Sequence, residues 1–189
     1  MEAIAGRRDG RGGAGVIRVV LTGSESTGKT TLAGQLARHY DADLVPEFVR
    51  AYAEQKGGSI EFNDHGPIAH GQISLEDEHI ARAARLIVQD TDLLSTVVYC
   101  KHYFGHCPPW IEESAAARRP DLYLLCEIDL DWIADGVRDR GHMRDEMQQL
   151  FRDAVRESAV PTVTITGVGD ERLDRAVDAI DALRLLREA

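Results

Sequence analysis

The feature that most constrains this chain is a glycine-rich loop: Gly23, Ser24, Glu25, Ser26, Thr27, Gly28, Lys29 and Thr30. It matches G-x-x-x-x-G-K-[ST] in full, and it lies between the β-branched run 16–22 and a helical segment, 29–40. In this context the backbone N–H groups converge on phosphates, and the positive end of the helix adds to the attraction. We expect the loop and Thr31 to bind a nucleoside triphosphate, with Lys29 at the β- and γ-phosphates and Thr30 on Mg²⁺. A plain turn between strand and helix is the alternative.

Apolar runs typical of strands alternate with helical patterns along the rest of the chain. The runs lie at 16–22, 43–45, 85–89, 121–128 and 161–166. Near-continuous runs of this kind are typical of a parallel sheet that is covered on both faces. Between them the apolar spacing becomes helical, as in the stripe formed by Met147, Leu150, Phe151 and Ala154. We predict one α/β domain over residues 16–189, with the P-loop NTPase fold: a five-stranded parallel sheet with helices on both faces.

Composition narrows the class of partner. The chain has 189 residues and a formal net charge of −10, and its glycine- and arginine-rich residues 1–15 are expected to be a disordered tail. A negative surface argues against nucleic acid as a partner, and no apolar run is long enough to suggest membrane insertion. The three cysteines favour free thiols in the cytoplasm over a disulfide framework. The sequence leaves the oligomeric state open.

A magnesium ion at the phosphate loop also needs a carboxylate near the end of a neighbouring strand. Asp90 follows the run 85–89, so we expect it to bind the metal together with Thr30. Asp92 comes two positions later, and it would face the same side and contact the substrate if the extended geometry persists. The alternative for Asp92 is a turn or a helix cap, and the sequence leaves the two open.

The remaining motifs favour phosphoryl transfer to a small acceptor. The chain has no Asn/Thr-Lys-x-Asp guanine-reading element, and Asp90 is not followed by the glutamate that activates water in many motor ATPases. A kinase must exclude water, and segment 135–145 has the arginines and the hinge glycines of a lid. We expect Arg138 to act in catalysis and Arg140 to bind the nucleotide, with Arg144 beside them. A solvated loop of paired arginines and aspartates is the alternative.

An acceptor hydroxyl needs a base, and Glu47 is the candidate. It follows the strand at 43–45, which places it at the carboxyl edge of the sheet, where open α/β sheets bind ligands. Arg50 lies one helical turn further on, where it could hold Glu47 or a phosphate. A surface ion pair between the two side chains is the alternative.

Taken together, these segments resemble the ribosylnicotinamide kinase domain of the bacterial NadR family. The similarity extends from about residue 17 to 186, through the stretches 23–33, 46–54, 69–72, 89–96, 120–126 and 131–139. The resemblance implies ATP- and Mg²⁺-dependent phosphorylation of the 5′-hydroxyl of nicotinamide riboside, giving nicotinamide mononucleotide for NAD synthesis. A regulatory ATPase that acts on a protein partner is the alternative. No adenylyltransferase-type His-x-x-His element precedes Gly23, so we expect a stand-alone kinase without repressor or adenylyltransferase activity.

The acceptor that the resemblance implies has a cationic pyridinium ring, which favours carboxylates and aromatic faces. Gln72, in the matching stretch 69–72, is expected to bind the ribose or the amide, and an exposed helix glutamine is the alternative. Tyr99 and Trp110 are expected to contact the acceptor, with core packing as the alternative for each. Gly167 follows the last strand and is expected to contact the adenine through its backbone, which is compatible with a turn.

Overall fold

The computed structural model describes residues 15–83, 85–130 and 143–188, and the structural statements below concern these ranges. The predicted disordered tail lies outside them except for its last residue. Most of the predicted lid, including Arg138 and Arg140, also lies outside them, whereas Arg144 is described.

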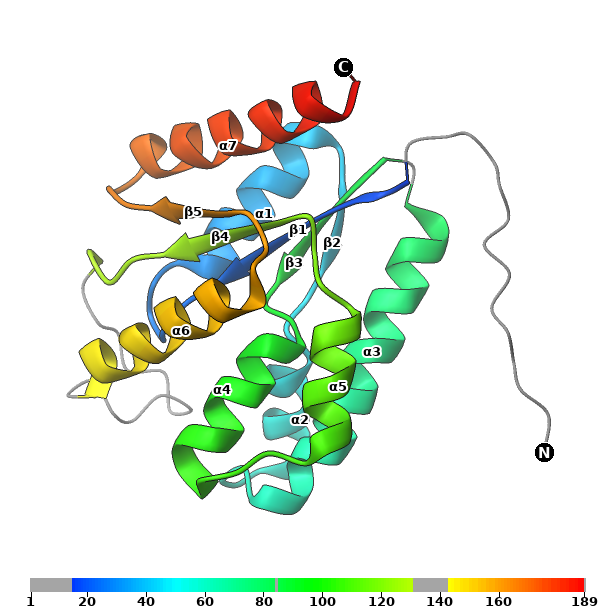
Figure 1. Ribbon diagram of the computed structural model, residues 1–189, viewed down its shortest axis with the longest axis vertical. Helices are drawn as coiled ribbons and strands as arrows, with labels where there is room; N and C mark the ends of the chain where they lie inside the picture. Colours follow the sequence, from blue (N-terminus) through cyan, green and yellow to red (C-terminus); the bar gives the residue numbers. More distant parts are fainter. Residues whose placement is uncertain (1–14, 84, 131–142, 189) are drawn as a thin grey trace.

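Within these ranges, five strands form one parallel sheet (Figure 1). They are β1 (Ile17–Thr22), β2 (Asp43–Val45), β3 (Leu86–Asp90), β4 (Leu122–Cys126) and β5 (Thr162–Ile165). Their order across the sheet is β2-β3-β1-β4-β5, so the first strand of the chain lies in the middle. The predicted parallel five-stranded sheet is confirmed, with strand ends within about two residues of the apolar runs.

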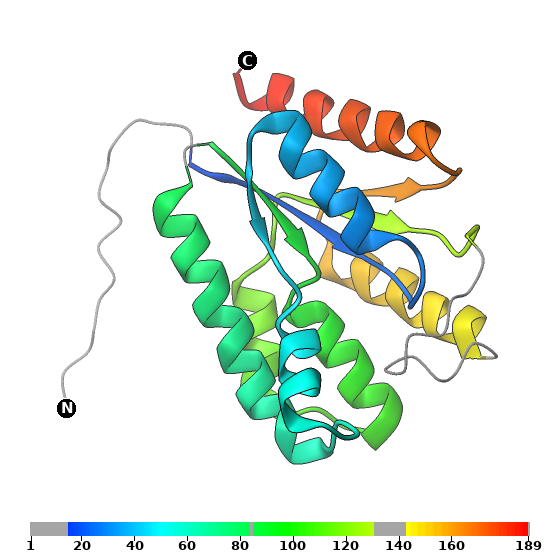
Figure 2. The same ribbon diagram turned by 180° about the vertical axis from the view of Figure 1, so that it is seen from behind.

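Helices cover both faces of this sheet (Figures 1 and 2). The described helices are α1 (Lys29–Tyr40), α2 (Phe48–Lys56), α3 (His65–Arg82), α4 (Leu93–Phe104), α5 (Pro109–Ala117), α6 (Arg144–Ser158) and α7 (Asp170–Glu188), with a 3₁₀ turn at Phe62–Asp64. None of the helices in the described part of the chain has the length and hydrophobicity that crossing a bilayer requires.

Side chains alternate along the strands and so build a core on each face. On one face Val19 and Leu21 of β1 pack with residues of α1 and α7. On the other face Val20 of β1 packs with residues of α4 and α6, including Phe151. A third cluster joins α3, α4 and α5, with Ile111 fully buried. The period of two along a strand produces this division.

The loops that follow the strands gather at one edge of the sheet, because all five strands run in the same direction. The register pairs Val45 of β2 with Gln89 and Leu21 of β1 with Asp90, so β2, β3 and β1 end side by side. The candidate site is built at this edge, where open α/β sheets bind ligands.

Candidate active site

The loop between β1 and α1 holds its lysine against its own backbone. Lys29 Nζ donates to the carbonyl oxygens of Gly23, at 2.9 Å, and Ser24, at 2.7 Å. The Thr27 hydroxyl also donates to the Ser24 oxygen, at 2.9 Å. Only 9 % of Lys29 is exposed, so its ammonium is fixed close to the backbone of the loop.

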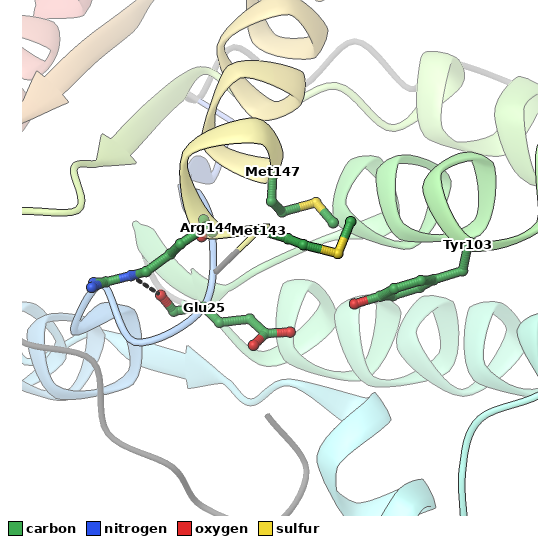
Figure 3. Close-up of a pocket in the computed structure, with 6 residues that line it drawn as sticks. Glu25, Tyr103, Met143, Arg144 and Met147 are labelled. Atoms are coloured by element: carbon green, nitrogen blue, oxygen red, sulfur yellow. Dashed lines mark hydrogen bonds between the residues drawn. The ribbon is translucent and has the colours of Figure 1, made fainter. Parts of the chain in front are cut away.

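Two arginines hold the carbonyl groups further along the loop. Arg144 at the start of α6 donates from Nε to Glu25 O at 3.1 Å (Figure 3) and from Nη2 to Ser26 O at 2.9 Å. Arg172 in the first turn of α7 donates from Nη2 to Thr27 O at 2.7 Å. The next carbonyl, that of residue 28, accepts the first hydrogen bond of α1. Each carbonyl from residue 23 to 28 therefore has a donor.

This arrangement orients the N–H groups of the loop. In a trans peptide the carbonyl of one residue and the N–H of the next point in opposite directions. Because the carbonyls of residues 25–27 face Arg144 and Arg172, the N–H groups of residues 26–28 point away from those arginines. N–H groups that converge at a helix N-terminus form an anion-binding site, and binding of a triphosphate by this loop stays a prediction.

Gln148, for which the sequence predicted no role, attaches the phosphate loop to the end of β4, the strand beside β1 in the sheet. Gln148, completely buried on α6, accepts from the Ser24 N–H at 2.9 Å and donates to Cys126 O at 3.1 Å. A Cβ at Gly23, where φ is +128°, would lie 2.6 Å from the same Cys126 oxygen, so this position requires glycine. The available signal was a polar residue inside an apolar helical stripe, between Met147 and Phe151.

Asp90 lies at the end of β3, as predicted for a metal-binding carboxylate. The residue is 4 % exposed, and its Oδ1 has no hydrogen-bond partner among the described residues. A buried carboxylate oxygen without a donor is costly unless a cation or another donor satisfies it. Thr30, the predicted second ligand, is exposed in the first turn of α1.

Asp92 does not continue the strand. Thr91 adopts a left-handed conformation, with φ of 68°, and the chain turns into α4. Asp92 Oδ1 accepts from the Leu94 N–H at 3.0 Å, and Oδ2 accepts from the Tyr123 hydroxyl at 2.7 Å. Burial raises the pKa of Asp92 to about 6, although the hydrogen bond from Tyr123 opposes this effect. Of the two alternatives, the structure shows the helix cap: the extended geometry that would align Asp92 with Asp90 ends at Thr91. Contact with the substrate stays a prediction.

Glu47 is the N-cap residue of α2, two positions after the end of β2. Arg50 Nε lies 3.7 Å from Glu47 Oε2, and the side chains are 40 % and 19 % exposed. The ion pair expected at this spacing is therefore present. The roles of Glu47 as a base and of Arg50 in binding stay predictions.

The start of α2 rests on α3. The Phe48 N–H donates to Gln72 Oε1 at 3.0 Å, and only 3 % of Gln72 is exposed. A Cβ at Gly71 would lie 2.2 Å from the Phe48 ring, so the ring lies directly against the α3 backbone. The alternative of an exposed helix glutamine is wrong, because Gln72 is buried and positions the residue that follows Glu47. Its predicted contact with the acceptor stays untested.

The two predicted aromatic contacts are engaged in ring packing. Tyr99 stacks on Tyr103, with ring centroids 6.1 Å apart, and meets Phe151 edge-on at 5.5 Å. Trp110 stacks on His70 at 4.5 Å and packs against the cluster of α3, α4 and α5. These contacts favour core packing for both residues, and their contact with an acceptor remains a prediction.

A small hollow lies beside the phosphate loop. Figure 3 shows Glu25 of the loop and Tyr103 of α4 on either side of it, with Met143, Arg144 and Met147 from α6 and the residue before it. The hollow is therefore lined by an acidic side chain of the phosphate loop and by an aromatic side chain of α4.

Gly167, after β5, has both backbone groups engaged. Its N–H donates to Asp129 Oδ2 at 2.6 Å, and its carbonyl accepts from Arg172 Nη1 at 3.0 Å. Its φ of +94° is in the region that favours glycine. The turn expected here is present, and the contact with adenine stays a prediction.

Comparisons with known proteins agree with this geometry. Residues 18–172 match the family described as AAA domain (AAA_28). The trifunctional NAD biosynthesis/regulator protein NadR of Escherichia coli (strain K12) is 30% identical over 169 residues, which are 86% of this chain and 41% of that protein. The chain therefore spans less than half the length of this curated relative.

Two solved structures of NadR share the fold. The one in complex with NR has a TM-score of 0.78 and 27% identity, and the match covers 89% of this chain and 51% of that chain. The one in complex with NAD and AMP-PNP has a TM-score of 0.72 and 26% identity, with coverage of 89% and 49%. The predicted P-loop fold and the resemblance to the kinase domain of the NadR family are confirmed.

Proposed function

We propose, from the premise that this chain belongs to the AAA_28 family of AAA domains, that it is an ATP-dependent kinase that phosphorylates the 5′-hydroxyl of nicotinamide riboside. The product is nicotinamide mononucleotide, a precursor of NAD. The observation that carries the proposal is the phosphate loop with its carbonyls turned to lysine and arginine side chains, next to carboxylates at two adjacent strand ends. The NadR structures with NR and with AMP-PNP, an ATP analogue, support the two substrates.

The residues present fit a magnesium ion. Mg²⁺ is usually held by one or two carboxylates together with substrate phosphates and water. The buried Asp90 oxygen without a donor and the exposed Thr30 hydroxyl supply that donor set. Bound there, Mg²⁺ would neutralise charge on the β- and γ-phosphates. Among the residues that the structure describes, no group of three or more His, Cys, Asp or Glu could hold a metal by itself.

The protein groups would act by positioning and by proton transfer. Lys29 and the N–H groups of the loop hold the phosphates and stabilise charge in the transition state. Glu47 accepts the proton of the acceptor hydroxyl as the hydroxyl oxygen bonds to the γ-phosphorus; the bond from that phosphorus to the β–γ bridging oxygen breaks, and ADP leaves. Arg50 orients the Glu47 carboxylate. Arg144 lies at the phosphate loop, and we assign Arg138 and Arg140, outside the described residues, to the lid that excludes water.

The test is steady-state ATP consumption with and without nicotinamide riboside, with the product identified by mass spectrometry. Consumption that depends on the acceptor and yields nicotinamide mononucleotide supports the kinase. Hydrolysis at the same rate without acceptor would instead support a regulatory ATPase that acts on a protein partner. The variant Lys29→Ala serves as the control for contaminating ATPases.

The proposal also includes the cellular location and the partners of the enzyme. We place it in the cytoplasm, because its three cysteines are free thiols, and we expect no nucleic-acid partner, because the chain carries a formal net charge of −10. A filter-binding assay with duplex DNA, at low and at physiological salt, checks the second point.

A further inference from the structure

A single buried arginine of α7 connects three other segments at the carboxyl edge of the sheet. Arg172 is 4 % exposed and donates to Thr27 O at 2.7 Å, Glu127 O at 3.2 Å, Gly167 O at 3.0 Å and Asp129 Oδ1 at 2.6 Å. These acceptors belong to the phosphate loop, to the segment after β4 and to the loop after β5. The sequence predicted no role for the side chain of Arg172 or of Asp129.

Asp129 completes the connection. One of its oxygens pairs with Arg172, and the other accepts from the Gly167 N–H at 2.6 Å. The pair therefore holds both the N–H and the carbonyl of Gly167. A buried guanidinium requires a counter-charge and hydrogen-bond acceptors, and Asp129 with three carbonyls supplies them to Nη1 and Nη2, whereas Nε has no partner among the described residues. Both loops are thereby attached to one rigid, planar group.

The two loops lie on opposite sides of β4 in the sheet. The phosphate loop follows β1, and the loop of Gly167 follows β5, two strands away in the order β1-β4-β5. Neighbouring strands are about 4.8 Å apart, so the loops begin about 10 Å from each other. That span is comparable with the length of a nucleotide from its phosphates to its base. Val168, 59 % exposed next to Gly167, presents an apolar side chain at this position.

We infer that Arg172, held by Asp129, is a positioning residue for the nucleoside triphosphate: it fixes the loop after β5, against which the base lies, relative to the phosphate loop. The inference rests on the proposed use of ATP and on the predicted contact of Gly167 with adenine, but not on the identity of the acceptor. With the guanidinium in place, a nucleotide whose base binds at the loop after β5 has its triphosphate in the phosphate loop, and neither loop has to be ordered on binding. Without the guanidinium, Lys29 and Arg144 still hold the carbonyls of residues 23–26, so the phosphate site persists while the base side loosens.

The experiment measures equilibrium binding to the full chain by calorimetry, in the presence of Mg²⁺ and without acceptor, for ATP, GTP and inorganic tripolyphosphate. For Arg172→Gln we expect the Kd of ATP to rise about tenfold or more, the factor that loss of one hydrogen bond to a charged group corresponds to. The Kd of tripolyphosphate should change less than about threefold, since the charged groups of the phosphate loop remain. The ratio of the ATP and GTP affinities should move towards one.

Two further variants and a control make the test specific. Arg172→Lys keeps the charge but not the planar fork, and Asp129→Asn keeps the shape but not the counter-charge; both should show the same ATP-selective weakening to a smaller degree. Arg175 lies about one turn after Arg172 on α7, is exposed and pairs with Glu171. Arg175→Gln should leave all three affinities unchanged.

Equal weakening of ATP and tripolyphosphate, or no weakening of either, would overturn the inference, because the arginine would then act on the phosphate loop alone or on folding alone. If Arg172→Gln fails to fold by circular dichroism, Arg172→Lys and Asp129→Asn decide the matter by the same criterion. A wild-type chain that binds ATP but does not phosphorylate nicotinamide riboside would refute the proposed acceptor and leave this inference intact.

Discussion

Asp92→Asn separates the two roles that the sequence allows for Asp92. In the structure its carboxyl is buried, caps α4 through the Leu94 N–H and accepts from the Tyr123 hydroxyl. Asparagine is as good an N-cap as aspartate, so the substitution removes the ionisable group and keeps the cap. Its effects should therefore appear in the pH dependence of stability rather than in substrate binding.

The magnitude follows from the pKa. Burial raises the pKa of Asp92 from 3.8 to about 6. Between these values the folded protein holds a proton that the unfolded chain has released, so the free energy of unfolding falls as the pH rises from about 4 to about 6. The carboxyl is protonated in both states below this window and ionised in both above it. A difference of two units corresponds to about 3 kcal/mol.

The assay is urea denaturation of wild type and Asp92→Asn at several pH values between 4 and 7. The difference in unfolding free energy, variant minus wild type, should rise by about 3 kcal/mol over this range and then level off. The amide leaves the Tyr123 hydroxyl proton without an acceptor, which lowers the whole curve by about 1 kcal/mol without changing its shape.

Tyr123→Phe provides the matched comparison. The hydroxyl of Tyr123 opposes the rise in the pKa of Asp92, so its removal should move the pH-dependent step to higher pH. A pH-independent difference between wild type and Asp92→Asn would refute the burial argument. A large increase in the KM of the acceptor for Asp92→Asn at pH 7, with stability unchanged, would show instead that Asp92 contacts the substrate.

Three other predictions concern residues at the carboxyl edge of the sheet. Lys29→Ala should lower kcat at least about 10²-fold, because it removes a stabiliser of transition-state charge, and melting curves control for its lost contacts with the loop. Glu47→Gln should lower kcat roughly 10²–10⁴-fold with ATP affinity near wild type, whereas Asp90→Asn should change the Mg²⁺ dependence; a Glu47→Gln defect that excess Mg²⁺ repairs would reverse the two roles. Gly71→Ala places a Cβ 2.2 Å from the Phe48 ring, so the ring or the start of α2 must move. We expect kcat to fall up to about 10²-fold, with ATP affinity kept and partial rescue by Phe48→Leu.

Local patterns in the sequence were enough to predict the sheet. All five apolar runs became strands of one parallel sheet, and the helix expected at 29–40 has those bounds in the structure. Glycines, aspartates and prolines at the ends of these segments stop one periodicity before the next begins. The sequence does not predict the local backbone conformation where tertiary contacts determine it. The extended geometry expected after Asp90 ends at Thr91, whose positive φ no local pattern announces.

The contacts of the buried polar residues could not be predicted from the sequence, because their partners lie far away along the chain. Gln148 contacts Ser24 across 124 positions, and Arg172 contacts Thr27 across 145 positions. A glutamine in an apolar stripe or an arginine in a first helical turn is compatible with many surroundings. Gln72 shows the same difficulty: its family resemblance suggested a ligand contact, but the fold also uses it to hold the first N–H of α2.

The geometry of the phosphate loop is thus a property of the whole domain rather than of its motif. Lys29 comes from the loop itself, Arg144 from the start of α6 within the segment predicted as the lid, and Arg172 from the last described helix. Because each peptide is planar, a shift of Arg144 that turns the carbonyls of Glu25 and Ser26 also turns the N–H groups on the opposite side. We therefore expect movement at the start of α6 to change the affinity of the loop for phosphate, and phosphate bound to the loop to favour one position of α6.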